Sequence, residues 1–203
     1  MSHKLDMSLA RRCAERDPAA LEELVDEHYS AVLNFVYRFT GVREEAQDLA
    51  QEVFVKALGA LDRFDGHSSL RTWLFTIAAN AARDALRHRR RQREVTPDEA
   101  QESQLAETPD PSPDAGPEVR AVRTLRSALV RRMVLQLPEA HRMTVILRFY
   151  HDHSLQEIAE ICGCSVGTVG SRLHYAMRKL NAIVDADRDA REEFDVAEGG
   201  HCS

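Results

Sequence analysis

The stretch SLQEIAEICGCSVGTVGSRLHYAMRKL, residues 154–180, decides the fold class of this chain. Ser154 followed three positions later by Glu157 is a capping-box pattern, which predicts a short helix over residues 155–161. A Cys-Gly-Cys turn and a capping serine then lead into a longer basic helix over about 166–180. A short helix, a turn containing glycine and a second helix form the helix-turn-helix plan.

In a helix-turn-helix the first helix braces the second, whose N-terminal half enters the major groove of DNA. The side chains of the second helix that can reach bases or phosphates are Thr168, Ser171, Arg172, His174, Tyr175 and Arg178. The alternative is an ordinary helical hairpin with a solvated basic face. Residues 119–180 contain 10 Lys or Arg against 4 Asp or Glu, and this surplus favours DNA binding.

Charge is unevenly distributed along the 203 residues, although the whole chain carries a formal net charge of −6. Residues 94–118 contain no Lys or Arg, 8 Asp or Glu and 5 of the 7 prolines. Such a composition cannot bury enough apolar surface to offset the entropy of ordering, so we expect a flexible acidic linker. The linker separates a first block, residues 1–93, from a second, residues 119–180, and an acidic tail, residues 181–203, follows.

The first block is also predicted to be helical. Asp17-Pro18 combines an N-cap residue with a proline at the first helical position, and Gly41 is expected to end that helix. A second helix carries an acidic and polar face, and a third begins near Ser68 or Ser69 and ends in the arginine-rich run 87–93. Apolar residues recur at three-to-four spacing in both blocks, so the sequence predicts an all-α fold of two small helical domains.

Several classes of protein are disfavoured by what the sequence lacks. No apolar stretch approaches the ~20 residues that span a bilayer, and the N-terminus has no apolar signal core, so we expect a cytoplasmic protein. No phosphate-binding glycine loop and no HExxH or GxSxG motif is present, so we expect neither catalysis nor a cofactor. Cys162, Cys164, His201 and Cys202 are zinc-type ligands, but their spacing is not that of a zinc finger, and we expect no metal.

Two stretches together resemble a known family. The run DLAQEVFVKALGALDRFDGHSSLRTWLFTIAANAARDALRHRRR, residues 48–91, is similar to region 2 of an extracytoplasmic-function (ECF) sigma factor. The run LPEAHRMTVILRFYHDHSLQEIAEICGCSVGTVGSRLHYAMRKL, residues 137–180, is similar to region 4 of that family. The two stretches occur in the order that the family has, with a linker between them.

This resemblance implies binding to bacterial core RNA polymerase and promoter-specific initiation of transcription. Asp48, Gln51 and Glu52 match positions that dock on the polymerase. The residues that match positions recognising the melted −10 element are Phe64, Asp65, His67, Ser68, Asn80, Arg83 and Arg87. The helix from Val166 onward matches the reader of the −35 element as duplex DNA. Factors of this family are typically held by an anti-sigma partner, so the resemblance also implies such a partner.

One departure from the family pattern is Gly170, which stands where Lys or Arg is usual, so the −35 sequence cannot be carried over. A third hypothesis is a metal- or redox-sensing binding protein that uses Cys162, Cys164, His201 and Cys202. The main competing hypothesis is a stand-alone helix-turn-helix regulator. That hypothesis requires a dimer with its two recognition helices ~34 Å apart. It also leaves the loop RFDGHSS, residues 63–69, without a role.

Overall fold

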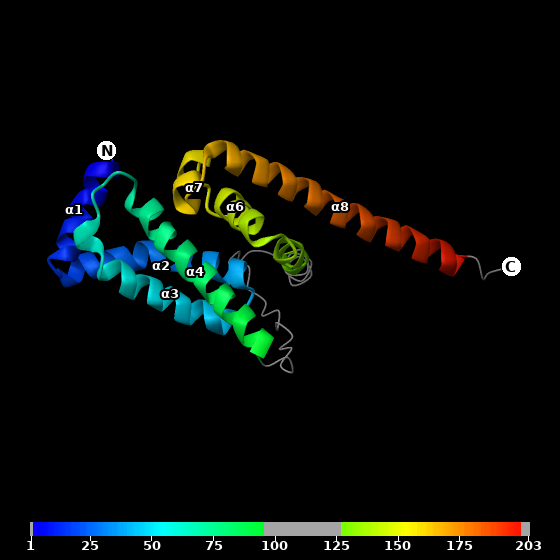
Figure 1. Cartoon of the computed structure of the whole chain (residues 1–203), viewed down its shortest axis with the longest axis horizontal. Helices are drawn as coiled ribbons and strands as arrows, with labels where there is room; N and C mark the ends of the chain where they lie inside the picture. The colour runs from blue at the N-terminus through cyan, green and yellow to red at the C-terminus, as the bar shows by residue number, and fades with distance from the viewer. Residues whose placement is uncertain (1, 96–126, 200–203) are drawn as a thin grey trace, which may run out of the picture.

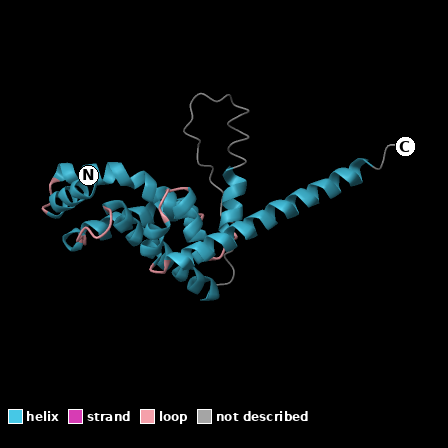
Figure 2. Ribbon diagram, turned by 90° about the horizontal axis from the view of Figure 1, so that it is seen from above, coloured by secondary structure: helices cyan, strands magenta, loops and turns pink. Residues whose placement is uncertain are grey.

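The computed structural model describes residues 2–95 and 127–199, with side chains placed for 6–92 and 127–186. All regular structure in these described ranges is helical, which confirms the predicted all-α class (Figures 1 and 2). The predicted linker over 94–118 lies almost entirely outside the described residues.

The N-terminal domain contains α1 (Ser2–Ala14), α2 (Pro18–Thr40), α3 (Arg43–Leu58), the 3₁₀ turn η1 (Leu61–Arg63) and α4 (Leu70–Val95). Its predicted helix signals are confirmed at both ends of α2. The side chain of Asp17 accepts a hydrogen bond from the backbone N–H of Ala19, at 3.1 Å. Gly41 ends the helix in the left-handed conformation, at φ 82°, which glycine adopts without steric cost.

Helix α1 has no counterpart among the helices that the sequence predicts. Its inward face is narrow and consists of Leu9, Ala10 and Cys13, all buried. A side chain from the same helix also fixes the start of α4, because Asp6 Oδ2 accepts the backbone N–H of Leu70 at 3.1 Å. The helix is missed in the sequence because so few apolar residues form a weak periodic signal.

The C-terminal domain consists of a helical stretch, residues 127–135, followed by α6 (Glu139–Phe149), α7 (Leu155–Cys162) and α8 (Val166–Gly199). The predicted capping box is confirmed, since Ser154 Oγ accepts the N–H of Glu157 at 3.2 Å and Glu157 Oε2 accepts the N–H of Ser154 at 2.8 Å. Gly163, at φ 63°, ends α7 and makes the turn into α8. The helix-turn-helix is therefore present.

The end of α8 differs from the prediction. The apolar stripe ends near Leu180 and predicts that the helix ends there, whereas the helix continues to Gly199 and extends away from the domains (Figure 1). Residues 181–198 contain neither glycine nor proline, so nothing in them interrupts helical hydrogen bonding. The remaining candidate ligands His201 and Cys202 lie outside the described residues.

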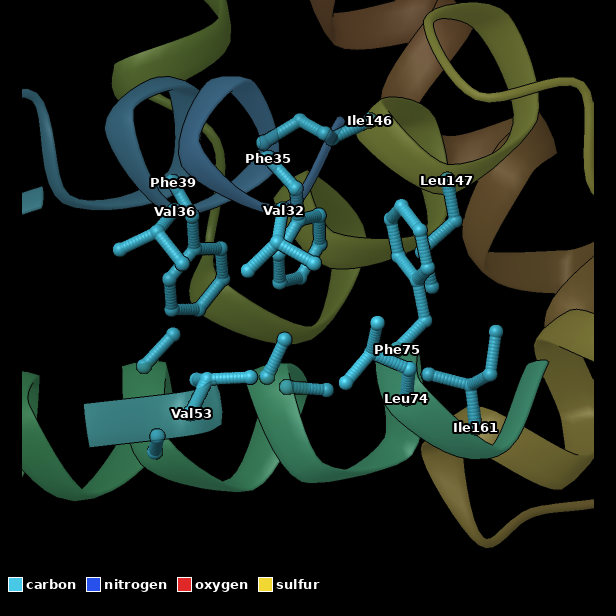
Figure 3. Packing of buried hydrophobic residues seen from close by; sticks show 14 of the residues in the cluster. Val32, Phe35, Val36, Phe39, Val53, Leu74, Phe75, Ile146, Leu147 and Ile161 are labelled. Carbon is cyan, nitrogen blue, oxygen red and sulfur yellow. The ribbon is translucent and has the colours of Figure 1, made fainter. Parts of the chain in front are cut away.

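The two domains pack against each other and share one hydrophobic core. Phe35 of α2 and Phe75 of α4 meet with ring centroids 5.4 Å apart. Ile146 and Leu147 of α6 and Ile161 of α7 bring the C-terminal domain against them, as Figure 3 shows. Each of these five side chains is at most 1% exposed, so the contact between the domains is part of the folded core.

Candidate nucleic-acid interface

The first turns of α8 are organised around a serine cap. Ser165 Oγ accepts the backbone N–H of Thr168 at 3.1 Å and lies 2.8 Å from its hydroxyl oxygen. Ser171 Oγ donates to the carbonyl of Thr168 at 3.0 Å. Thr168 is half-buried within this cap, whereas Ser171, His174 and Arg178 are exposed. These three side chains form an open face that a duplex can approach.

Two other candidates on α8 are engaged within their own domain. Arg172 is half-buried, and its Nη1 donates to Cys164 Sγ at 3.6 Å. Tyr175 is 47% exposed, but its ring lies over that of His141 of α6, with centroids 4.4 Å apart. Gly170 lies on the same helix, and a Cβ added there meets nothing within 4 Å. The glycine is therefore not required by packing.

Helix α3 presents the predicted acidic and polar face to solvent. Asp48, Gln51 and Glu52 are all exposed, and Glu52 forms an ion pair with Lys56 at 2.5 Å. Val55, one turn from Gln51, is 70% exposed, which the sequence reasoning did not note. Polar groups beside an exposed apolar side chain are the composition of a protein-binding surface.

The loop from Phe64 to Ser69 places its candidates differently from the expectation. Phe64 is only 8% exposed, and its ring packs edge-on against that of Trp73 with centroids 5.5 Å apart. In this structure the ring supports the loop from beneath, and its contact with a flipped base stays a prediction. The indole that covers it belongs to α4, a partner that the local sequence does not reveal.

The polar residues of this loop remain accessible. Asp65 Oδ1 accepts the backbone N–H of His67 at 3.1 Å, and its other oxygen lies 3.4 Å from His67 Nε2. The side chains of His67 and Asp65 are 90% and 65% exposed. Ser68 is half-buried. The carboxylate thus holds a short turn whose polar atoms face solvent.

Of the three candidates on α4, Arg83 contacts the C-terminal domain. Asn80 is exposed and its Oδ1 accepts from Arg83 Nη1 at 2.8 Å. Burial raises the pKa of the Cys162 thiol, and the adjacent Arg83 acts in the opposite direction. Arg87, also exposed, is paired with Asp84 at 3.2 Å. Two candidate DNA-contacting arginines, Arg83 and Arg172, therefore approach the same Cys-Gly-Cys turn.

Helix α7 lies along α4, which places Arg83, one of the −10 candidates, at the domain contact. Near the start of α4, Thr72 Oγ1 donates to Glu157 Oε1 at 3.1 Å, although the two residues are 85 positions apart in the chain. At its other end α7 reaches Arg83 through Cys162. The face of α4 between these points is covered by α7.

Further polar contacts join the domains. Arg71 Nη2 donates to the carbonyl of His151 at 2.6 Å, and Arg142 Nη1 donates to that of Phe39 at 2.8 Å. The Arg38 guanidinium lies 3.8 Å from the centre of the Tyr150 ring. These contacts join residues that are far apart in sequence, so no local motif predicts them.

The described residues give no support to a metal centre. They contain no cluster of three or more His, Cys, Asp or Glu side chains with the geometry to hold an ion. Cys13 is buried in the core, far along the chain from Cys162 and Cys164. None of the helices over the described part of the chain is both long and apolar enough to cross a bilayer.

Comparison with known families finds one match in each of the two domains. Residues 24–92 match Sigma-70 region 2, and residues 127–180 match Sigma-70 region 4. These matches contain α3 and α4 on one side and the helix-turn-helix on the other.

Similar proteins extend over nearly the whole chain. RNA polymerase sigma factor YlaC of Bacillus subtilis is 37% identical over 84% of this chain and 95% of its own length. The RNA polymerase sigma-H factor of Pseudomonas aeruginosa is 34% identical over 89% and 94%. ECF RNA polymerase sigma-E factor of Escherichia coli is 33% identical over 89% and 95%.

A solved structure shares the arrangement as well. CnrH, in complex with the cytosolic domain of CnrY, matches with a TM-score of 0.67 and 30% identity over 90% of this chain and 98% of its own. The family matches, the identities and the helical architecture agree, and the chain belongs to the ECF sigma factors of bacterial RNA polymerase.

Proposed function

We propose that this sigma factor docks on core polymerase through α3 and contacts promoter DNA through two separate surfaces. The docking surface consists of Asp48, Gln51 and Glu52 together with Val55. The −10 surface consists of Asp65, His67, Ser68, Asn80, Arg83 and Arg87, and the −35 surface of Thr168, Ser171, Arg172, His174, Tyr175 and Arg178. No step in this function calls for catalysis by the chain itself, and its place of action is the cytoplasm, where the polymerase works.

The observation that carries the proposal is the face of α8. Ser171, His174 and Arg178 are exposed on a recognition helix that α7 and a serine cap hold in place. Exposed hydroxyl, imidazole and guanidinium groups at the start of such a helix can contact base edges and phosphates in the major groove. The −35 element is therefore expected to be read as duplex DNA.

The −10 surface is suited to single-stranded DNA. Asp65 and His67 supply acceptor and donor atoms at a loop tip, and Asn80 adds both kinds on α4. An unpaired base exposes the hydrogen-bonding edge that such groups read, while Arg83 and Arg87 lie along the same helix to meet phosphates. Because Phe64 is buried, base recognition in this loop is expected to rest on hydrogen bonds from its polar residues.

An anti-sigma partner fits the same picture. The similar structure CnrH is bound to the cytosolic domain of CnrY. We expect this chain likewise to be controlled by a protein that binds it and competes with polymerase. Its exposed apolar side chains on α8, Tyr175, Met177 and Val184, are candidates for that contact.

Transcription in vitro tests the proposal. The purified full chain is added to bacterial core polymerase with genomic promoter fragments, and new start sites are mapped. We expect discrete starts that need both the chain and the core enzyme. Specific duplex binding without core binding or new starts would instead identify a stand-alone helix-turn-helix regulator.

A further inference from the structure

Two histidines from the C-terminal domain are inserted into the domain contact. His151 and His153 lie between α6 and α7 and are 5% and 1% exposed. The His151 ring packs against Phe35 of α2 and Phe75 of α4, with centroids 5.9 and 4.9 Å away. The His153 ring meets the same Phe75 at 4.8 Å. Both imidazoles therefore sit in an apolar site that exists only while the domains are together.

Neither imidazole is fully satisfied in that site. The Nε2 atoms of His151 and His153 are buried and have no hydrogen-bond partner. A buried polar atom without a partner is costly, and a buried charge on the same ring is more costly still. Burial accordingly lowers the pKa of His151 to about 3 and that of His153 to about 4.

The charged groups around the pair mostly oppose protonation. From the N-terminal domain, Arg71 of α4 acts on both rings and Arg38 of α2 acts on His151. Arg148 of α6 donates to the carbonyl of His153 at 3.0 Å. The acids that favour protonation are Glu157 of α7, whose Oε1 is 3.9 Å from His153 Nδ1, and Asp152 between the histidines. Burial outweighs these acids, so both rings are neutral in the closed arrangement.

We propose that His151 and His153 make the packing of the two domains depend on pH, so that acidification from pH 7.5 to 5.5 separates them. Once apart, both rings are exposed to water and titrate near ~6.5. Protons then bind the open arrangement but not the closed one, so closure is favoured above this pKa and is lost as the pH falls through it.

The expected size of the effect follows from this linkage. Each histidine shifts the ratio of open to closed molecules about 10-fold between pH 7.5 and 5.5, and the pair shifts it about 100-fold. Opening frees the face of α4 between Thr72 and Arg83 that α7 covers. Any effect of this opening on promoter binding rests on the proposed function. The opening of the two domains does not depend on that function.

Small-angle scattering of the full chain tests the opening directly, without polymerase or DNA. Measurement on the monomer peak from a sizing column excludes association near the isoelectric point of about 5.9. We expect the radius of gyration to increase from pH 7.5 to 5.5. The variant H151L/H153L, with two apolar side chains in the apolar site, is expected to stay compact at both values.

The matched control is H88Q, which removes an exposed histidine near the end of α4. It is expected to expand with the wild-type chain. If the double variant does not fold, as judged by helical circular dichroism, the single variants H151L and H153L decide, since each should keep about a 10-fold shift and open at lower pH. A wild-type chain that stays compact at pH 5.5, or histidine variants that open as the wild type does, would overturn the proposal.

Discussion

Helices α4 and α8 both carry candidate DNA contacts, but they use their surfaces in different ways. The inner face of α4 is buried against its own domain through Leu74 and against the other domain through Phe75. Helix α8 packs against its own domain through Val169 and Ala176, and the rest of its length extends into solvent (Figure 1). Substitutions on the inner face of α4 therefore change fold and domain contact together, whereas exposed positions of α8 can be altered without changing either.

The difference is clearest at two arginines. Arg83 on α4 lies beside Cys162 in the domain contact, and Arg172 on α8 bonds to Cys164 within its own domain. Separation of the domains would remove the contact between Arg83 and Cys162. The contact between Arg172 and Cys164 lies within one domain and would remain. In the closed molecule Arg83 is thus partly covered, whereas other proposed −10 residues, such as Asp65 and Asn80, and the outer face of α8 remain exposed.

The largest expected effect is on the shared core. Phe75→Ala removes a fully buried ring that contacts Phe35, His151 and His153. We expect the free energy of unfolding to fall by about 3–5 kcal/mol, measured by urea denaturation. Met177→Ala on α8, where the side chain is 41% exposed, is the control and is expected to change it by less than about 1 kcal/mol. An equal loss of unfolding free energy in both variants would show that α8 is as important to the fold as the inner face of α4.

The next effect concerns polymerase binding. Replacing Asp48, Gln51 and Glu52 together by Ala on the exposed face of α3 leaves the core intact. We expect affinity for core polymerase to fall at least about tenfold, or about 1.4 kcal/mol. Fluorescence anisotropy of the labelled chain measures it, and the loss should shrink at high salt because charge attraction is screened. Unchanged affinity would show that α3 is not the docking surface.

Arg172→Ala tests the −35 surface by itself. The guanidinium is half-buried beside Cys164, so its loss removes one candidate contact with DNA and little packing. Transcription from promoters that depend on the −35 element is expected to fall about tenfold. Promoters that lack the element are the control and should keep their activity. A uniform loss at both kinds of promoter would point to a folding defect.

Gly170→Lys is the smallest change and acts in the stabilising direction. A Cβ at this helical position meets nothing within 4 Å, so the new side chain fits. We expect about 0.5–1 kcal/mol of added stability from helix propensity and tighter, more salt-dependent binding to duplex DNA. Gly163→Lys is the matched control: its Cβ also meets nothing, but φ is 63°, so this variant should lose stability. A loss of stability in G170K would contradict the open geometry around α8.

Much of the local structure was predictable from particular residues. Asp17 and Gly41 bound α2, and Ser154 with Glu157 starts α7, as their patterns indicate. Polar faces were also found correctly, since Asp48 and Ser171 are exposed. The failures were α1, whose apolar stripe is short, and the end of α8, where the stripe ends before the helix does. The burial of Phe64 was not predictable from its neighbours in sequence, because the ring that covers it belongs to Trp73 of the next helix.

The amino-acid sequence by itself determined the caps of α2 and α7, the helix-turn-helix and the family, because these depend on residues within about a turn of one another or on matched motifs. Only the tertiary structure decided that the domains pack together and that the two histidines are buried between them. Thr72 meets Glu157 across 85 residues of chain, and Arg71 meets the carbonyl of His151 across 80. Such contacts depend on how the side chains of already formed helices pack against one another. That packing involves residues from several elements, so no short stretch of sequence predicts it.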